Sequence, residues 1–249
     1  MAHSEYVRMV DGAKRAVIFI HGIVGKAEFY NEYYKLVPND VSIYGVLLDG
    51  HGKEVKDFSR TSMKKWEKQV EKIVNDLSKT HDEIYMVGHS MGTLFSIEQA
   101  TKNPKVKGIF LMASPVKVFI TPKLVKTILR VYLGKIREDR PVEAATRNYY
   151  GSSPNKNLFA YIPWIFRILE LFKKIRQTRR ILKKLETPTY IYQSVKDEVV
   201  SNKSIRYFRK RVPFPVYALV KSGHCYYEPS EQEFLYQEFK NFIEEKALN

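Results

Sequence analysis

The residues best suited to chemistry lie at positions 88–92, which read Gly-His-Ser-Met-Gly. This G-x-S-x-G pattern follows a short apolar run, Glu83–Val87, and precedes an amphipathic stretch, Met91–Thr101. A sharp strand-to-helix turn of this kind strains the serine backbone and holds its Oγ out of the sheet. The helix N-terminus that follows favours developing negative charge. We therefore predict that Ser90 is a nucleophile; the alternative is a serine in an ordinary glycine turn.

A serine nucleophile needs a general base, and the base needs an orienting carboxylate. Around a turn of this type, the chain order is serine, then acid, then histidine. His224 is the only histidine after Ser90, and it lies in a Ser-Gly-His loop behind an apolar run. We predict that His224 is the base, against the alternative of a histidine packed on the surface.

The orienting acid is expected in the loop after the preceding predicted strand, where Asp197 and Glu198 are neighbours. Asp197 is favoured because the residues directly after it, Val199 and Val200, read as a buried return into the next helix. Glu198 remains the competing candidate.

The oxyanion of an acyl-transfer reaction needs backbone N–H donors that are fixed before the reaction starts. One donor is expected from Met91, the residue after the nucleophile. The other is expected from the loop 21–25, where a turn at Gly22 aims the Ile23 N–H inward. His21 precedes the serine in the chain, so we interpret it as a residue that braces this loop.

Other kinds of site find no support in the sequence. The six histidines, including His51 in the Asp-Gly-His-Gly turn at 49–52, do not cluster with carboxylates or cysteines at metal-ligand spacing. Neither G-x-x-x-x-G-K-[ST] nor G-x-G-x-x-G is present. We predict no metal site and no cofactor.

Short apolar runs alternate with amphipathic helical stretches along most of the chain. The runs are continuous and β-rich, which is typical of parallel strands buried on both faces. The alternation predicts an α/β protein with a mostly parallel, doubly wound sheet, whose chemistry lies at the carboxyl ends of the strands. The expected strands are Ala16–Ile20, Val41–Leu48, Glu83–Val87, Val106–Ala113, Thr189–Tyr192 and Pro215–Val220, and the expected helices include Thr61–Leu77, Met91–Thr101 and Glu231–Glu245.

Several of these motifs together resemble the monoacylglycerol lipase and bacterial carboxylesterase group of α/β-hydrolases. The resemblance implies the α/β-hydrolase fold with a helical cap over the site, and hydrolysis of glycerides or of short- to medium-chain acyl esters. It also implies Ile23 and Met91 at the oxyanion positions, although the family often has an aromatic residue in place of Ile23. The motifs that carry it are 21–25, 50–52, Trp66, 88–92, Asp197 and 222–224.

Residues 116–187 break the alternation, because they contain no convincing strand. We interpret them as a helical cap inserted into an α/β-hydrolase core formed by residues 1–115 and 188–249. Within the insert, Leu124–Leu133 and Leu158–Leu185 read as helical stretches, and Pro163 marks a kink or a helix start.

The insert also carries most of the charge. The chain has a net charge of +15, and 17 basic and 5 acidic side chains place +12 of it in the insert. Two interpretations are open: a cap helix with an apolar face over the site and solvated lysines outside, or a basic amphipathic surface that contacts anionic lipid. Nucleic acid is not expected, because the aromatic residues precede the basic run Lys173–Lys184 instead of alternating with it.

The expected function is therefore a serine hydrolase that cleaves carboxylic esters with an apolar acyl group through an acyl-enzyme on Ser90. The same three residues would serve a thioesterase, an acyltransferase or a peptidase, and a non-catalytic module that binds lipid or anions is a further alternative. The N-terminus lacks the pattern of a signal peptide, no apolar run could span a bilayer, and the single cysteine, Cys225, fits a reducing compartment. We expect a cytoplasmic protein.

Overall fold

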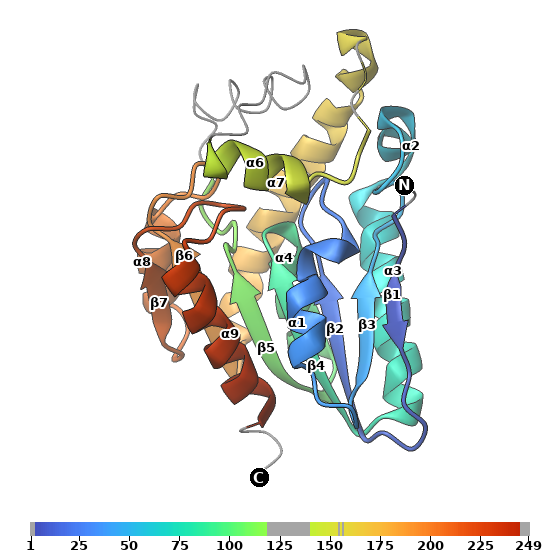
Figure 1. Ribbon diagram of the computed structural model, residues 1–249, viewed down its shortest axis with the longest axis vertical. Helices are drawn as coiled ribbons and strands as arrows, with labels where there is room; N and C mark the ends of the chain where they lie inside the picture. Colours follow the sequence, from blue (N-terminus) through green and yellow to red (C-terminus); the bar gives the residue numbers. More distant parts are fainter. Residues whose placement is uncertain (1–2, 119–139, 154, 156, 245–249) are drawn as a thin grey trace.

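The strands form one seven-stranded sheet in the order β1-β3-β2-β4-β5-β6-β7 (Figure 1). The computed structural model describes residues 3–118, 140–153, 155 and 157–244. Neighbouring strands in this part of the chain run parallel, except that β1 pairs antiparallel with β3 at one edge. The strands are β1 (Tyr6–Arg8), β2 (Arg15–Ile20), β3 (Ser42–Val46), β4 (Glu83–His89), β5 (Val106–Met112), β6 (Thr189–Ser194) and β7 (Val216–Leu219).

Helices cover both faces of the sheet, so the predicted doubly wound α/β-hydrolase fold is confirmed. In Figure 1, α1 and α9 lie on one face, and α3, α4 and α7 lie on the other. The helices are η1 (Ala27–Tyr30), α1 (Asn31–Leu36), α2 (Val55–Arg60), α3 (Met63–Thr80), α4 (Met91–Lys102), α6 (Pro141–Tyr149), η2 (Leu158–Tyr161), α7 (Trp164–Ile181), η3 (Leu182–Lys184), α8 (Lys203–Arg209) and α9 (Pro229–Glu244). None of those in the described ranges has both the length and the apolar content of a membrane span.

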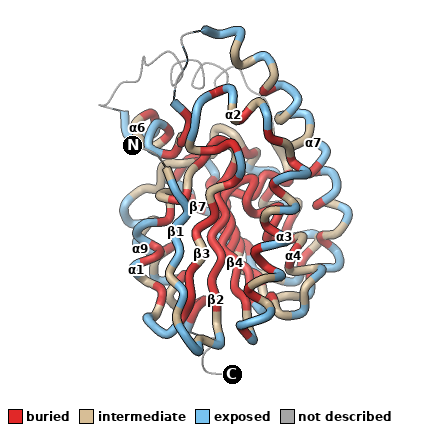
Figure 2. The backbone as a smooth tube through the Cα atoms, turned by 90° about the vertical axis from the view of Figure 1, so that its right-hand side faces the viewer, coloured by how far each residue is buried: buried red, intermediate tan, exposed pale blue. Residues whose placement is uncertain are grey.

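The central strands are buried on both sides, as Figure 2 shows. Ile18 and Met86 belong to the hydrophobic cluster beneath α3 and α4, whereas Phe19 and Val87 belong to the cluster beneath α1 and α9. Successive side chains of a strand point to opposite faces. Burial of both faces therefore explains why the strand sequences are continuously apolar rather than alternating.

Helix α3 illustrates how a local pattern specifies an element. Its buried face consists of the residues whose spacing predicted the helix. The helix begins two residues later than expected, because Ser62 is the N-cap and its Oγ accepts the Lys65 N–H at 3.2 Å. The buried residues are Met63, Trp66, Val70, Ile73, Val74 and Leu77.

Most elements that the sequence patterns did not predict are short; helix α6, with nine residues, is the longest of them. Strand β1 has three residues and is mostly exposed, and α1, α2 and α8 have six, six and seven residues. Helices of fewer than two turns offer too few positions for a 3.6-residue periodicity to stand out.

The segment between β5 and β6 leaves the sheet. Helix α6, η2 and the first half of α7 lie above the carboxyl ends of the strands, and the second half of α7 packs beside α4 (Figure 1). Pro163 directly precedes α7 and is a helix start. The expected helical stretch Leu124–Leu133 lies outside the described residues.

The basic run at the end of α7 is only partly a solvated surface. Lys173 is exposed, but the side chain of Lys174 is only 3% exposed. The Lys174 ammonium forms ion pairs with Glu67, at 2.8 Å, and with Glu98. Arg179 donates to the Val116 carbonyl. The expectation of solvated lysines was therefore wrong for Lys174, because two carboxylates of the core draw it inward.

We predict that Lys174→Met lowers the free energy of unfolding by about 2 kcal/mol, because it leaves two partly buried carboxylates without their shared cation. Urea denaturation measures this change. The matched control is Lys173→Met on the exposed neighbouring position, which should change stability by less than about 0.5 kcal/mol. Equal effects of the two variants would contradict an ion-paired role for Lys174.

Candidate active site

Ser90 occupies the sharp turn between β4 and α4. Its φ of 51° and ψ of −121° lie in a backbone region that residues other than glycine rarely adopt. The Ser90 N–H donates to the Met112 carbonyl of the neighbouring strand at 2.9 Å, which helps to hold the strained turn. A Cβ on Gly92 would collide with the Ile20 carbonyl oxygen, so glycine is required for α4 to approach β2 this closely.

Ser90, His224 and Asp197 lie together at the carboxyl end of the sheet. The distance from Ser90 Oγ to His224 Nε2 is 3.0 Å, and that from His224 Nδ1 to Asp197 Oδ2 is 2.8 Å. The ionised Asp197 carboxylate can only accept a hydrogen bond, so Nδ1 carries the imidazole proton. Nε2 is then free to accept the Ser90 hydroxyl hydrogen.

The acid loop distinguishes Asp197 from Glu198. The Asp197 side chain is 1% exposed, and its Oδ1 accepts the N–H groups of Val199 at 2.8 Å and Val200 at 2.7 Å. Its Oδ2 thereby faces the His224 ring. Glu198 instead accepts the backbone N–H of His224 at 3.1 Å. The structure thus places Asp197 against the imidazole and Glu198 against the main chain of the same residue.

The surroundings of His224 favour its protonated form. Burial by itself lowers its pKa, but the charge and hydrogen bond of Asp197 and the charge of Glu198 more than offset this. The pKa of His224 is therefore raised above the usual 6.5. The same two carboxylates would stabilise a protonated His224 imidazole.

The two predicted oxyanion positions lie beside Ser90. Met91 is the first residue of α4, and Ile23 lines the cavity beside Ser90. Neither backbone N–H has a hydrogen-bond acceptor within the described ranges. The N–H of Gly22, in contrast, is used: it donates to the Tyr149 hydroxyl at 2.8 Å.

His21 braces the loop next to the site, as its place in the sequence suggested. Its Nδ1 donates to the Gly22 carbonyl at 2.7 Å and its Nε2 accepts the Leu48 N–H at 3.1 Å. Burial lowers the pKa of His21 to about 4, so the ring is neutral. Burial also holds the pKa of His51 well below its usual value. No group of three or more potential metal ligands occurs among residues 3–118, 140–153 and 157–244.

A cavity of about 240 Å³ opens beside Ser90 and His224. Helix α7 supplies one wall through Ile168, Leu171, Phe172 and Ile175, which recur at i, i+3, i+4 and i+7 and so share one helix face. Glu198 is the one carboxylate among the described lining residues. The cavity therefore suits an apolar chain held next to Ser90.

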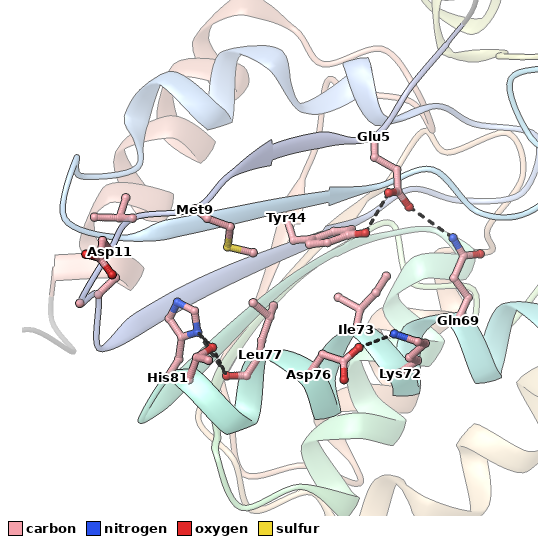
Figure 3. A pocket seen from close by; sticks show the side chains of 14 residues that line it. Glu5, Met9, Asp11, Tyr44, Gln69, Lys72, Ile73, Asp76, Leu77 and His81 are labelled. Atoms are coloured by element: carbon pink, nitrogen blue, oxygen red, sulfur yellow. Dashed lines mark hydrogen bonds and ion pairs between the residues drawn. The ribbon is translucent and has the colours of Figure 1, made fainter.

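A larger hollow of about 700 Å³ lies elsewhere, between β1, β3 and α3 (Figure 3). Several of its polar side chains are paired with one another: Tyr44 and Gln69 both donate to Glu5, and Lys72 pairs with Asp76. None of the predicted site residues lines it. The site at Ser90 therefore remains the candidate.

Two residues of the site carry no sequence signal of their role. Tyr149, at the end of α6, reaches the loop 21–25, and its hydroxyl oxygen lies 3.2 Å from His89 Nδ1. His89 Nε2 in turn lies 2.9 Å from the His224 carbonyl oxygen. His89 was visible only as a variable position of the G-x-S-x-G motif, and no motif marks Tyr149.

Comparison with known proteins agrees with this geometry. Residues 11–226 match the family described as serine aminopeptidase, S33. The thermostable monoacylglycerol lipase of Bacillus sp. (strain H-257) is 25% identical over 198 residues, which cover 74% of this chain and 71% of that protein. The probable lysophospholipase BODYGUARD 4 of Arabidopsis thaliana is 32% identical over 104 residues, 40% of this chain but only 24% of that protein.

Solved structures with the same fold include lipolytic enzymes. In the structural study of LipS and LipT, two metagenome-derived lipolytic enzymes, the matched chain has a TM-score of 0.73 at 16% identity, with 98% of each chain covered. The monoacylglycerol lipase of Paleococcus ferrophilus has a TM-score of 0.70 at 15% identity, again with 98% of each chain covered. With the family match over most of its length, the chain is an α/β-hydrolase that belongs to the family described as serine aminopeptidase, S33.

Proposed function

We propose that the protein hydrolyses carboxylic esters with an apolar acyl group, such as monoacylglycerols or short- to medium-chain acyl esters, through an acyl-enzyme on Ser90. The observation that carries this proposal is the 3.0 Å contact between Ser90 Oγ and His224 Nε2 beside a mostly apolar cavity. The named activity of the Bacillus relative, a monoacylglycerol lipase, supports the same substrate class.

In the first half of the reaction, His224 Nε2 takes the hydroxyl proton while Ser90 Oγ bonds to the ester carbonyl carbon. The carbonyl oxygen becomes an oxyanion, which accepts hydrogen bonds from the Ile23 and Met91 N–H groups. The bond from the carbonyl carbon to the alcohol oxygen then breaks. His224 gives its proton to that oxygen, and the alcohol leaves.

In the second half, water replaces the alcohol. His224 takes a proton from water as the water oxygen bonds to the acyl carbon. The bond to Ser90 Oγ then breaks, Oγ recovers the proton from His224, and the carboxylic acid leaves. Throughout, Asp197 fixes the imidazole tautomer and stabilises the imidazolium. The proposed reaction uses no cofactor.

An amide-cleaving activity is the alternative that the family description raises. An aminopeptidase must bind the ammonium group of its substrate. The carboxylate that lines the described cavity belongs to Glu198, and one of its oxygens already accepts the His224 N–H. An apolar acyl chain therefore fits the cavity better than a charged amino terminus.

The insert also suggests how the protein meets a poorly soluble substrate. We propose that the outer apolar face of the cap contacts anionic lipid. This face is exposed although its residues are large and apolar, with Phe159 78% and Phe166 61% exposed. Lys173 and Arg176, exposed farther along α7, supply positive charge. The face consists of Leu158, Phe159, Ile162, Ile165, Phe166 and Leu169.

Ser90→Ala should lower kcat for ester hydrolysis by about six orders of magnitude, because it removes the oxygen that forms the acyl bond in the proposed reaction. The assay compares the rates of hydrolysis of p-nitrophenyl esters, monoacylglycerols, acyl-CoA and aminoacyl anilides. A second measurement follows labelling of the protein by a fluorophosphonate probe. The control is Ser59→Ala, whose hydroxyl donates to the Val55 carbonyl of its own helix. A tenth of the activity left in Ser90→Ala, or wild-type preference for the anilides, would refute the proposal.

Asp197→Asn should lower kcat by about 10⁴, and Glu198→Gln by much less. The base must be neutral, so kcat/KM rises with pH through the raised pKa of His224. Loss of the Asp197 charge lowers that pKa and moves the acidic limb of the profile to lower pH; loss of the Glu198 charge moves it less far. Steady-state kinetics as a function of pH test both. The assignment fails if Glu198→Gln is the more damaging variant.

Replacing both Phe159 and Phe166 by Ser should weaken binding to phosphatidylglycerol vesicles at least about tenfold, because two exposed aromatic side chains no longer enter the lipid. Hydrolysis of vesicle-borne monoacylglycerol should fall in parallel, while hydrolysis of soluble p-nitrophenyl butyrate should not change. Val7→Ser, an exposed apolar position on β1, is the control. Equal effects on both substrates, or none, would contradict lipid contact by this face.

A further inference from the structure

The Tyr149 hydroxyl joins the cap to the loop that carries an oxyanion donor. Tyr149 is the last residue of α6 and is buried, and its Oη accepts the Gly22 N–H at 2.8 Å. A Cβ added to Gly22 would collide with this Oη and lie 2.7 Å from Ser90 Cβ. The phenol oxygen, the loop backbone and the nucleophile therefore converge on one point.

The direction of each hydrogen bond in this network is fixed. The His224 carbonyl oxygen can only accept, so His89 Nε2, at 2.9 Å, carries the proton. Burial holds the pKa of His89 well below its usual value, so the ring is neutral and Nδ1 is an acceptor. The Tyr149 O–H, which burial keeps protonated by raising its pKa, must then donate to Nδ1. The chain of donors runs from Gly22 through Tyr149 to His89, and from His89 to His224.

The oxyanion loop has a reason to need such support. Val24 has a φ of 52°, a strained conformation for a β-branched residue. Its carbonyl accepts the Gly151 N–H at 2.9 Å, so the end of α6 and the residues after it hold the loop at two points. Ile23, whose N–H is the proposed oxyanion donor, lies between the Gly22 N–H and the Val24 carbonyl that are held.

The other end of the network holds the base. The main chain of His224 is fixed on both sides, by His89 at its carbonyl and by Glu198 at its N–H. The side chain of Asp197 fixes the ring. A shift of His89 would therefore move the His224 backbone relative to Ser90.

We propose that Tyr149 and His89 form a positioning relay through which the cap holds the Ile23 N–H and the His224 base in position relative to Ser90. The relay rests on the proposed ester hydrolysis. Neither residue touches the reacting atoms in this scheme; each acts on a group that does. The cap is then part of the catalytic apparatus as well as a cover for the acyl cavity.

The test is Tyr149→Phe, which deletes the hydroxyl but keeps the ring contacts with Phe29 and His89. A misplacement of about 1 Å in an active site can cost about 10²-fold, as can loss of an oxyanion donor. We expect kcat for p-nitrophenyl butyrate to fall by about that factor with little change in KM. An alkylboronic acid forms a bond between its boron and Ser90 Oγ, which gives a tetrahedral anion. The affinity for this compound should fall in proportion to kcat/KM.

Three comparisons make the result decisive. Tyr161→Phe removes a cap hydroxyl that accepts the Asn155 N–H, and it should behave as wild type. His89→Gln breaks the relay independently and serves if Tyr149→Phe does not fold. Because the two residues act as one unit, the double variant should lose no more activity than the more damaging single variant.

Wild-type kcat and boronate affinity in Tyr149→Phe would overturn the relay. So would a lower melting temperature and a raised KM with kcat unchanged, which is the signature of a purely structural role. Failure of the wild-type protein to react with a fluorophosphonate would instead refute the proposed function itself, so the two failures are distinguishable.

Discussion

The hydrogen bond between Ser90 Oγ and His224 Nε2 joins residues 134 positions apart, and the rest of the structure is arranged to keep it at 3.0 Å. The sheet accounts for most of this arrangement, because β4 and β7 run parallel and Ser90 and His224 both follow the carboxyl ends of these strands. Gly92 allows α4 to close on β2, so Ser90 projects from a rigid turn. Open α/β sheets place their chemistry at the carboxyl ends of the strands. In this protein the backbone alone brings Ser90 and His224 to that end of the sheet.

Burial then determines what each histidine of the site can do. His21, His51, His89 and His224 are all buried, and burial lowers the pKa of the first three. Only the pKa of His224 is raised within this set, because Asp197 and Glu198 supply negative charge beside it. The neutral rings serve as fixed donors and acceptors between loops. One ring among these four is therefore suited to gain a proton, and it is the one that contacts Ser90 Oγ.

Helix α7 of the insert contacts both the core and the site. Its second half packs beside α4 and is bound to the core through Lys174. Its first half lines the cavity beside Ser90 on one face and exposes apolar side chains on the other. Within the described part of the insert, the positive charge is accordingly not one surface. Part of it is matched by Glu67 and Glu98 of the core, and part remains exposed along α7.

The sequence by itself determined the elements and the residues whose signals are local. Continuous apolar runs specified the strands, a 3.6-residue pattern specified α3, and a glycine-flanked turn together with chain order singled out Ser90 and His224, because burial and turn geometry leave a mark on neighbouring residues. The sequence favoured Asp197 and left Glu198 open. Only the tertiary structure decided that Asp197 faces the imidazole, that Lys174 is buried, and that Tyr149 reaches the loop 21–25. These outcomes depend on how loops far apart in the chain converge. No local pattern encodes that convergence, since a side chain of the same type could equally have faced solvent.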